Sequence, residues 1–562
     1  MRQLMRTIMM MTTKEKIQNL IKKAIKELQA EKKLPAFKIP EILVAKSERK
    51  EHGDYATNIA MVIAKEAKKK PMEIAEALKS KIKKDPTGSL REQKSKTKTK
   101  NKKINIIEKI EIEEPGFVNF FLSSDYLQKQ VKEVLKKEED FGSVNLGRGK
   151  KLQVEFISAN PTGPLTVGNA RGGPFGDALG NILEMAGWKV ERAYYVNDYG
   201  QQIIALGHSV LKDKNAQYKG DYIDKLHRKI QERDVYKAGQ RAAREIMKMI
   251  KKTTDRLGIK YNEWIWESKF YQSSAVEKVL DFLKKKKLIY QKEGALWFRS
   301  SKFGDKRDRV VVKKDGSKTY LAGDIALHQY KFEKKKFQKV INIWGADHQG
   351  DVPGLQAAVT ALGHRGKLDI ILLQFVTILK KGKPLKMSKR RGVFLTMDEL
   401  LDEVGLDVVR FFFLQKSANT HLHFDLDLAK EQSEKNPVYY VQYAYARSCS
   451  IIKKSKIKKQ KLKGEIKNAR IELLGYPSEL NLIKQLIRLP EIVEDTARDY
   501  QVQRLCQYAL DLATAFHQFY RDCKVLVKDV ELQKARLALI LATRAVLKKT
   551  LRLMGISAPE RM

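Results

Sequence analysis

Apolar residues recur at helical spacing near the start of the chain, over residues 14–29, and a second helical pattern runs from 55 to about 82. Two strand-like stretches follow at 104–112 and 116–122, separated by a Pro-Gly turn. Together these patterns predict a small α+β domain that ends near residue 124.

Strands and helices alternate in the middle of the chain. Polar and apolar residues alternate over 151–157, a Gly/Pro-rich loop interrupts the pattern, and a helical pattern covers 169–185. A further strand is expected at 340–344, then a helix from Val352, then a strand at 370–376. This order is typical of a parallel α/β sheet of the nucleotide-binding, Rossmann type.

From about residue 397 the pattern is helical almost to the end of the chain, which predicts an all-α domain. Two lysine-rich runs stand apart from these elements. Residues 92–103 contain no apolar residue and 453–463 contain only Ile457 and Leu462, so neither can build a core. We expect the first to be a disordered basic loop and both to tether a polyanion. A tolerated insertion with solvated lysines is the alternative.

The charge balance strengthens this expectation, because Lys and Arg total 111 against 67 Asp and Glu, a formal net charge of +44. Such an excess favours a nucleic acid partner. The alternatives are an unusual ionic environment and a lysine-biased genome with ordinary solvated helix faces. With 562 residues, the chain is long enough for roughly three or four domains.

Composition also excludes some classes of protein. No uninterrupted apolar stretch approaches the ~20 residues that span a bilayer, and the Met-rich start lacks the apolar segment of a signal peptide. Cys449, Cys506 and Cys523 are far apart and lack metal-ligand spacing. We therefore expect buried thiols in a reducing cytoplasm and no structural metal.

The loop Ser158-Ala-Asn-Pro-Thr-Gly-Pro-Leu-Thr-Val-Gly-Asn-Ala-Arg-Gly-Gly joins a predicted strand to a predicted helix. Free amides and the helix dipole at such a junction favour a phosphate group, and the glycines permit close backbone approach. The chain has no Walker-type glycine-lysine-serine/threonine loop, so the usual NTPase fingerprint is missing. A simple turn is the alternative.

A second candidate is the basic segment Lys386-Met-Ser-Lys-Arg-Arg-Gly392. Two lysines three positions apart can contact a triphosphate from one side and stabilise the negative charge that develops as pyrophosphate leaves. Taken alone, this segment would be interpreted as a solvated basic loop.

Together the two segments resemble the paired "HIGH" and "KMSKS" signatures of class I aminoacyl-tRNA synthetases, here Thr166-Val-Gly-Asn and Lys386-Met-Ser-Lys-Arg. The chain resembles arginyl-tRNA synthetases nearly end to end. The strings that carry this resemblance are His52-Gly-Asp-Tyr-Ala-Thr-Asn, Gly116-Phe-Val-Asn-Phe, Val154-Glu-Phe-Ile-Ser-Ala-Asn-Pro-Thr-Gly-Pro-Leu, Tyr194-Tyr-Val-Asn-Asp, Tyr320-Leu-Ala-Gly-Asp-Ile-Ala, Trp344-Gly-Ala-Asp-His, Asn436-Pro-Val-Tyr-Tyr-Val-Gln-Tyr-Ala-Tyr-Ala-Arg and Gly555-Ile-Ser-Ala-Pro-Glu-Arg-Met.

The resemblance implies a multidomain α/β protein. Residues 1–124 would form an additional N-terminal tRNA-binding α+β domain, and 125–396 a Rossmann-type catalytic domain with a connective insertion at about 205–315. A stem linker at 397–430 would lead to an all-helical anticodon-binding domain at 431–562. The implied enzyme is an arginine–tRNA ligase that forms arginyl-adenylate and transfers arginine to the tRNA 3′ end, with a tRNA-dependent first step. Its partners would be tRNA(Arg), L-arginine and ATP with Mg²⁺, and it would be a cytoplasmic monomer without membrane contact.

The resemblance also implies roles for individual residues. Arginine would be bound by Glu155, Ser158, Asn160, Asp198, Tyr320 and Asp324, and ATP by Pro164, Gly168, Gly345, Asp347, His348, Met387 and Ser388. Thr166, Asn169, Lys386 and Lys389 would be catalytic, and Asn58, Tyr440, Tyr443, Arg447 and Met562 would contact tRNA. A guanidinium presents a planar fork of donors that two carboxylates can pair with, whereas lysine cannot match both.

The chain departs from the family pattern at Thr166 and Asn169, which stand in place of two histidines. They keep hydrogen-bond donors but never carry charge, so charge stabilisation would fall to the loop lysines, Mg²⁺ and backbone amides. One alternative is a catalytically inactive tRNA-binding relative, although the retained Glu155 and Asp324 argue against it. Another class I synthetase is a second alternative, disfavoured by the arginyl-type C-terminus and N-terminal domain.

Overall fold

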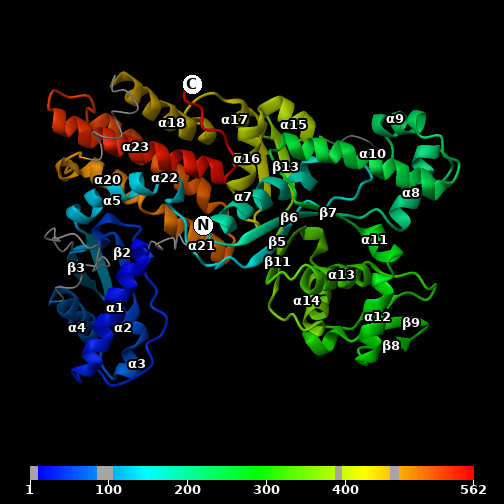
Figure 1. Cartoon of the computed structure of the whole chain (residues 1–562), viewed down its shortest axis with the longest axis horizontal. Coiled ribbons are helices and arrows are strands. Elements are labelled where there is room, and N and C mark those ends of the chain that lie inside the picture. The colour runs from blue at the N-terminus through cyan, green and yellow to red at the C-terminus, as the bar shows by residue number, and fades with distance from the viewer. Residues whose placement is uncertain (1–10, 85–104, 386–394, 456–467) are drawn as a thin grey trace, which may run out of the picture.

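A computed structural model describes residues 11–84, 105–385, 395–455 and 468–562. In Figure 1 a central sheet connects the C-terminal helices, the N-terminal domain below them and two groups of elements on the opposite side. The basic run 92–103, residues 456–463 of the second run, and the predicted site residues Lys386, Met387, Ser388 and Lys389 lie outside the described residues.

The N-terminal domain combines helices with an antiparallel sheet. Helix α1 (Thr13–Ala30) matches the prediction; the Thr12 side chain caps it by accepting from the Glu15 amide, and Ile17, Ile21 and Ile25 are buried. The sheet has the order β1-β2-β4-β3. Its strands are β1 (Ala45–Lys46), β2 (Tyr55–Thr57), β3 (Ile107–Glu113) and β4 (Phe117–Leu122), and its other helices are α2 (Ile59–Val62), α3 (Ala64–Ala67) and α4 (Pro71–Lys84).

The prediction of one continuous helical segment from residue 55 to about 82 is wrong. Tyr55 begins a strand, because it pairs with Phe120 in the sheet and is buried. The helix is also interrupted at Lys68, whose left-handed backbone (φ 52°) ends α3 before Pro71 starts α4. The two strands predicted at 104–112 and 116–122 and the turn between them are confirmed, although β3 begins only at Ile107 and residue 104 lies outside the described residues.

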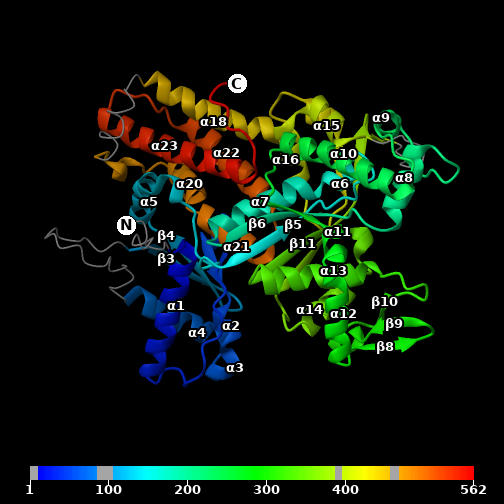
Figure 2. The same cartoon turned by 45° about the vertical axis from the view of Figure 1, so that its right-hand side comes forward.

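The central sheet is parallel throughout and has the order β12-β11-β5-β6-β7. Its strands are β5 (Lys151–Glu155), β6 (Lys189–Val196), β7 (Glu263–Trp266), β11 (Lys339–Gly345) and β12 (Leu368–Leu373). Figures 1 and 2 show α7 (Gly172–Met185) on one side of the sheet and α13 (Tyr320–Gln329) and α14 (Val352–Ala361) on the other. The connections run in opposite directions from β5 and β11, which makes their carboxyl ends the place where such sheets bind ligands.

Two details of the predicted catalytic domain need correction. The strand expected at 370–376 ends at Leu373, and Val376 begins β13 (Val376–Lys380) of another sheet. The insertion expected at about 205–315 is divided, because β7 belongs to the central sheet. Before it lie α8 (Gln201–Leu211), α9 (Asp221–Lys229) and α10 (Val235–Arg256); after it lie α11 (Glu267–Gln272), α12 (Ala275–Lys285) and the antiparallel strands β8 (Ile289–Lys292), β9 (Ala295–Phe298) and β10 (Arg309–Val312).

The prediction of helices beyond residue 397 holds except for β15 (Leu422–Asp425), which pairs in parallel with β13; β14 (Lys383–Pro384) pairs on the other edge of β13. The described helices of this part are α15 (Met397–Val404), α16 (Leu406–Leu414), α17 (Leu426–Lys430), α18 (Pro437–Lys454), α20 (Pro477–Leu486), α21 (Leu489–Asp499), α22 (Arg504–Asp522) and α23 (Val530–Leu553). No described helix is both long and apolar enough to cross a membrane. The three cysteines are free thiols.

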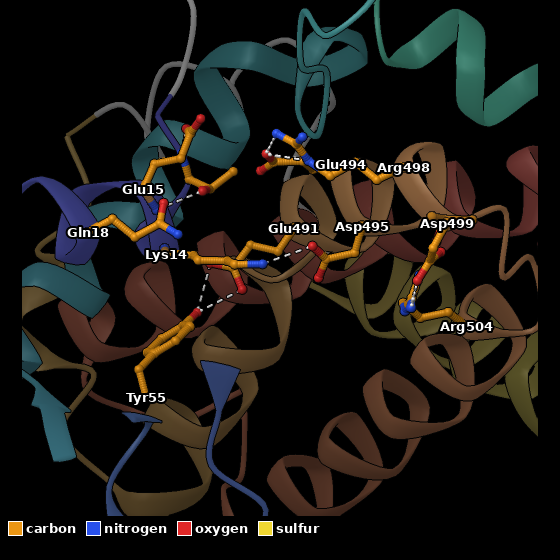
Figure 3. A network of polar contacts seen from close by, with 12 residues as sticks. Lys14, Glu15, Gln18, Tyr55, Glu491, Glu494, Asp495, Arg498, Asp499 and Arg504 are labelled. Carbon is orange, nitrogen blue, oxygen red and sulfur yellow. Dashed lines mark hydrogen bonds and ion pairs between the residues drawn. The ribbon is translucent and has the colours of Figure 1, made fainter. Parts of the chain in front are cut away.

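The N-terminal domain docks on α21 through a network of polar contacts (Figure 3). The Tyr55 hydroxyl donates to both carboxylate oxygens of buried Glu491, at 2.9 and 3.0 Å, and the Lys14 amide donates to the same group at 2.9 Å. The Lys14 ammonium pairs with Asp495 at 2.9 Å. Gln128 of α5 (Ser124–Lys137) donates to the Leu474 carbonyl, so the segment after residue 124 packs on the C-terminal part of the chain.

Candidate active site

A cavity of about 970 Å³ opens at the carboxyl ends of β5 and β11. It brings together most of the residues that the sequence assigns to arginine, ATP and catalysis. The residues of these predicted sets that line it are Glu155, Ser158, Asn160, Pro164, Thr166, Gly168, Asn169, Tyr320, Asp324, Gly345, Asp347 and His348. These predicted residues therefore share one place in the fold, whereas Lys386, Met387, Ser388 and Lys389 lie outside the described residues.

The chain leaves β5 in a strained conformation. Ile157 and Ser158 have φ values of 66° and 39°, a region that a β-branched residue such as Ile rarely adopts. The Ser158 hydroxyl donates to Oε1 of Glu155 at 3.2 Å and accepts from the Tyr195 amide at 3.1 Å. These bonds hold the bend that brings Asn160 to the cavity, and strain of this kind concentrates at functional sites.

Thr166 and Asn169 contact each other at the start of α6 (Val167–Ala170). The Thr166 side chain caps the helix by accepting from the backbone N–H of Asn169 at 3.4 Å. The Thr166 hydroxyl also donates to the side-chain oxygen Oδ1 of Asn169 at 2.5 Å. The hydroxyl proton of Thr166 is therefore used within the loop. The donor that the sequence assigned to Thr166 is thus directed at Asn169 in this arrangement.

Glu155 is paired with a lysine that the sequence did not single out. Lys331 is fully buried, and its ammonium lies 2.5 Å from Oε2 of Glu155 and 3.2 Å from Oδ1 of Asn342. The Asn342 amide donates to Nε2 of His328 at 2.9 Å, while Nδ1 of His328 donates to the Asp324 carbonyl at 2.7 Å. Burial, followed by the charge of Lys331, holds the pKa of His328 well below its ordinary value, so the imidazole is neutral and fixed.

Two other carboxyl groups at the cavity lack such a partner. Burial and the neighbouring Glu155 raise the pKa of Asp324 to about 7, and burial with Asp324 and Asp198 raises the pKa of Glu267 to about 8. Oε2 of Glu267 is buried without a hydrogen-bond partner. Among the described residues, no lysine or arginine lies within ion-pair distance of Asp324 or Glu267. Such a pair of carboxyl groups is suited to a cationic ligand.

Glu267 was missed by the sequence analysis, although it follows the apolar strand β7 directly. Recognising that strand as part of the parallel sheet would have placed Glu267 at the ligand-binding edge. Asp198, which was predicted to bind arginine, is not among the residues that line the cavity. Its two carboxylate oxygens accept from the Ser268 amide at 2.9 Å and the Ser268 hydroxyl at 2.7 Å, so it holds the start of α11.

The remaining predicted residues of the cavity are more exposed. The Tyr320 side chain is 66% exposed at the start of α13. Gly345 is the last residue of β11, Asp347 and His348 follow the strand, and Nδ1 of His348 lies 3.5 Å from Asp351. Open polar groups at a strand end leave room for a nucleotide beside the loop of residues 158–173.

The predicted tRNA contacts on α18 form part of a larger aromatic cluster. The Arg447 guanidinium lies 5.0 Å from the ring centres of both Tyr443 and Tyr520, and His517 lies 4.8 Å from Tyr440. His517 and Tyr520 come from α22 and were missed, because spacing within α18 carries no information on its neighbour. Met562 is 51% exposed, and Asn58 lies between β2 and α2 in the N-terminal domain.

A Rossmann-type sheet with a glycine-rich loop at its switch point, an acidic cavity beside that loop and a separate helical domain together define a class I aminoacyl-tRNA synthetase. The family described as tRNA synthetases class I (R), catalytic domain, matches residues 130–227 and 213–421. The arginyl tRNA synthetase N terminal domain matches 15–93, and the DALR anticodon binding domain matches 441–562. The chain belongs to the arginyl-tRNA synthetase family.

Relatives over the full length agree with this assignment. The chain is 41% identical to an arginine–tRNA ligase of Caldanaerobacter subterraneus subsp. tengcongensis, with 98% of this chain and 99% of the relative covered. It is 42% identical to arginine–tRNA ligase 1 of Halalkalibacterium halodurans, with 93% and 95% covered. The Thermus thermophilus arginyl-tRNA synthetase shares the fold, with a TM-score of 0.77 at 21% identity over 98% of this chain and 100% of that chain.

Proposed function

We propose that this chain is the ligase that attaches L-arginine to tRNA(Arg). The observation that carries the proposal is a pair of carboxyl groups, those of half-buried Asp324 and buried Glu267, which line the same cavity as the glycine-rich loop. A guanidinium can donate to both carboxylates at once through its planar fork. Removing these carboxylates from water costs free energy, and only a bound cation such as the guanidinium offsets this cost. The pocket therefore discriminates against amino acids that lack such a cation.

In the first step, the arginine carboxylate attacks the α-phosphate of ATP, and pyrophosphate leaves. The cavity residues Ser158 and Asn160 would hold the amino-acid end, with Tyr320 at the rim and Glu155 neutralised by Lys331. ATP would be contacted by Pro164, Gly168, Gly345, Asp347, His348, Met387 and Ser388. The transition state would be stabilised by Thr166, Asn169, Lys386 and Lys389. Mg²⁺ would enter with ATP, neutralising the phosphates as part of the substrate.

In the second step, the 3′ end of the tRNA attacks the arginyl carbonyl and displaces AMP. We propose that tRNA also completes the site for the first step, as an induced fit. Residues 1–124 and 431–562 would be the tRNA-binding domains, with contacts at Asn58, Tyr440, Tyr443, Arg447 and Met562. We further propose a monomer in the cytoplasm, where the three free thiols stay reduced.

Calorimetric titration with L-arginine and with L-citrulline tests the central contact. Citrulline has nearly the shape of arginine but a neutral ureido group. Arginine should bind and citrulline should not, because only a cation compensates the two carboxylates. Equal binding of the two amino acids would exclude the proposed pocket.

A further inference from the structure

Arg171 is a buried cation in the wall of the cavity. It lies where α6 meets α7, is 2% exposed and lines the cavity. Its guanidinium donates to two backbone carbonyls, that of Gln374 through Nη1 and that of Ser417 through Nη2 at 3.0 Å. Among the described residues no carboxylate pairs with it, and burial lowers its pKa to about 10. Burying a guanidinium without a counter-ion is unfavourable. The position of Arg171 therefore needs an explanation, and its two bonds to backbone carbonyls indicate where to look for it.

The two carbonyls belong to a joint between chain segments. The Gln374 amide donates to the Ala418 carbonyl at 2.9 Å, and the Leu422 amide donates to the Phe375 carbonyl at 2.9 Å. From there β13 and β15 continue as a parallel pair. Arg171 therefore fixes this joint to the helix that follows the glycine-rich loop, and Gln374, Phe375 and Val376 line the same cavity as that loop.

The glycine-rich loop has a second tie to this part of the molecule. The Met397 amide donates to the Leu165 carbonyl at 2.8 Å, and the Val167 amide donates to the Leu395 carbonyl at 3.3 Å. The segment 165–171 is thus bonded to described residues on both sides of positions 386–394. The glycine-rich loop, the Gln374–Val376 wall and the start of α15 are held together as one unit.

We propose that Arg171 is a positioning residue for ATP, which keeps the wall formed by Gln374, Phe375 and Val376 at its place beside the glycine-rich loop. The inference rests on the proposed function, because it takes ATP as the ligand of this part of the cavity. Phe375 is 57% exposed, and an exposed aromatic ring in a cavity wall is suited to contact with a nucleobase. The arginine end depends on Asp324 and Glu267 from other elements, so it should be insensitive to Arg171.

The test measures KM and kcat for ATP and for arginine separately, in ATP–pyrophosphate exchange with saturating tRNA. Arg171→Gln removes the guanidinium and its charge, and Arg171→Lys keeps the charge but loses the two-pronged fork. Phe375→Ala removes the wall's exposed ring. The controls are Arg488→Gln, a half-buried arginine that donates to Gln485 and Asp511, and Phe117→Ala, an exposed phenylalanine of the N-terminal domain.

All three cavity variants should raise KM for ATP about tenfold or more, the effect of losing roughly 1.4 kcal/mol of binding, while KM for arginine stays within about twofold. The double variant of Arg171→Gln with Phe375→Ala should lose little beyond the larger single effect, because both act on one wall. The controls should match the wild type.

Equal rises in both KM values for Arg171→Gln would overturn the proposal, and so would full recovery in Arg171→Lys, which would assign the effect to charge alone. If Arg171→Gln does not fold, the exposed Phe375→Ala decides, and an unchanged KM for ATP then overturns the proposal. A wild type that is inactive with arginine would instead contradict the proposed function, so the two failures are distinguishable.

Discussion

The Lys331 ammonium lies 2.5 Å from a carboxylate oxygen of Glu155, and both side chains are buried. The sequence had assigned Glu155, together with Asp324, directly to the substrate guanidinium. In the structure Glu155 already has a cation, and the carboxyl groups without one are Asp324 and Glu267. The cavity therefore holds two carboxyl groups that have no cationic partner in the described part of the protein, and the guanidinium of arginine would be that partner.

Lys331→Met should lower the free energy of unfolding by ~3–5 kcal/mol, because it leaves the Glu155 carboxylate buried without its partner. Adding Glu155→Gln to this variant should recover much of the loss, since the uncompensated charge is then gone. Thermal unfolding of the single and double variants measures both effects. A single variant as stable as the wild type would show that the pair is not desolvated.

Arginine binding should weaken as the pH falls from about 8 to about 6. The pKa values of Asp324 and Glu267 are raised to about 7 and about 8, so both groups become protonated over this range while the guanidinium stays charged. Binding must then displace protons, at a cost of up to about tenfold in affinity per pH unit for each proton. Calorimetry across the range checks this, with ATP affinity as the control. Asp324→Asn should bind arginine weakly and with a flatter pH profile; an equally steep profile would assign the titration to another group.

The contact of the N-terminal domain with α21 should carry its own pH dependence. Burial raises the pKa of Glu491 to about 7 from its ordinary value of 4.5, against the opposing effects of the Lys14 amide and the Tyr55 hydroxyl (Figure 3). A raised carboxyl pKa means that its contribution to stability is complete below about pH 4.5 and is lost as the pH rises to about 7. Glu491→Gln does not titrate, so its melting temperature relative to the wild type should rise between about pH 5 and about pH 7 and then level off.

Several other charged groups lie near Glu491, so a control for general charge effects is needed. These groups are Lys14, Asp495, Arg488, Lys46 and Asp54. Glu494→Gln removes a carboxylate from the same helix, one that pairs with Arg498 at 2.8 Å. Its melting temperature relative to the wild type should not follow the Glu491→Gln profile. The same pH profile in both variants would mean that net charge on α21, and not Glu491 itself, sets the effect.

Tyr443→Ala and Arg447→Gln should raise KM for tRNA about tenfold or more and leave KM for arginine unchanged. Unstacked bases gain ~1–3 kcal/mol by stacking on an aromatic ring, and Arg447 lies between the rings of Tyr443 and Tyr520. Tyr476→Ala, a 50% exposed tyrosine at the start of α20, is the matched control. If charging of tRNAs with altered anticodons is the same for wild type and both variants, the anticodon is recognised elsewhere.

The spacing of apolar residues along the chain predicted most helices and strands of this fold, because this spacing reflects which face of a single helix or strand is buried. Helix α1 and strand β11 follow directly from the spacing of apolar residues. The failures lie where partners distant in sequence decide. Tyr55 is extended because Phe120 pairs with it, and β15 exists because β13 offers an edge. Neither partner is visible in a local pattern.

The candidate site shows the same limit. Motifs carried by one segment, such as Thr166 with Asn169, could be located from the sequence. The groups that set the charge of the cavity could not, because Lys331, His328 and Glu267 become neighbours of Glu155 and Asp324 only through the topology of the sheet. Asp198 and Glu267 follow adjacent strands, and only the fold shows which of them faces the cavity.

The most direct test of the central claim is ATP–pyrophosphate exchange by the wild-type protein, measured with each amino acid in turn, with and without tRNA(Arg). Because the two carboxyl groups require a guanidinium, we expect exchange with arginine and almost none with lysine. Because tRNA completes the site, we expect this exchange only when tRNA is present. Exchange with lysine or another amino acid at a rate comparable to arginine would contradict the assignment of the pocket. Strong arginine-dependent exchange in a preparation free of RNA would contradict the induced-fit step alone.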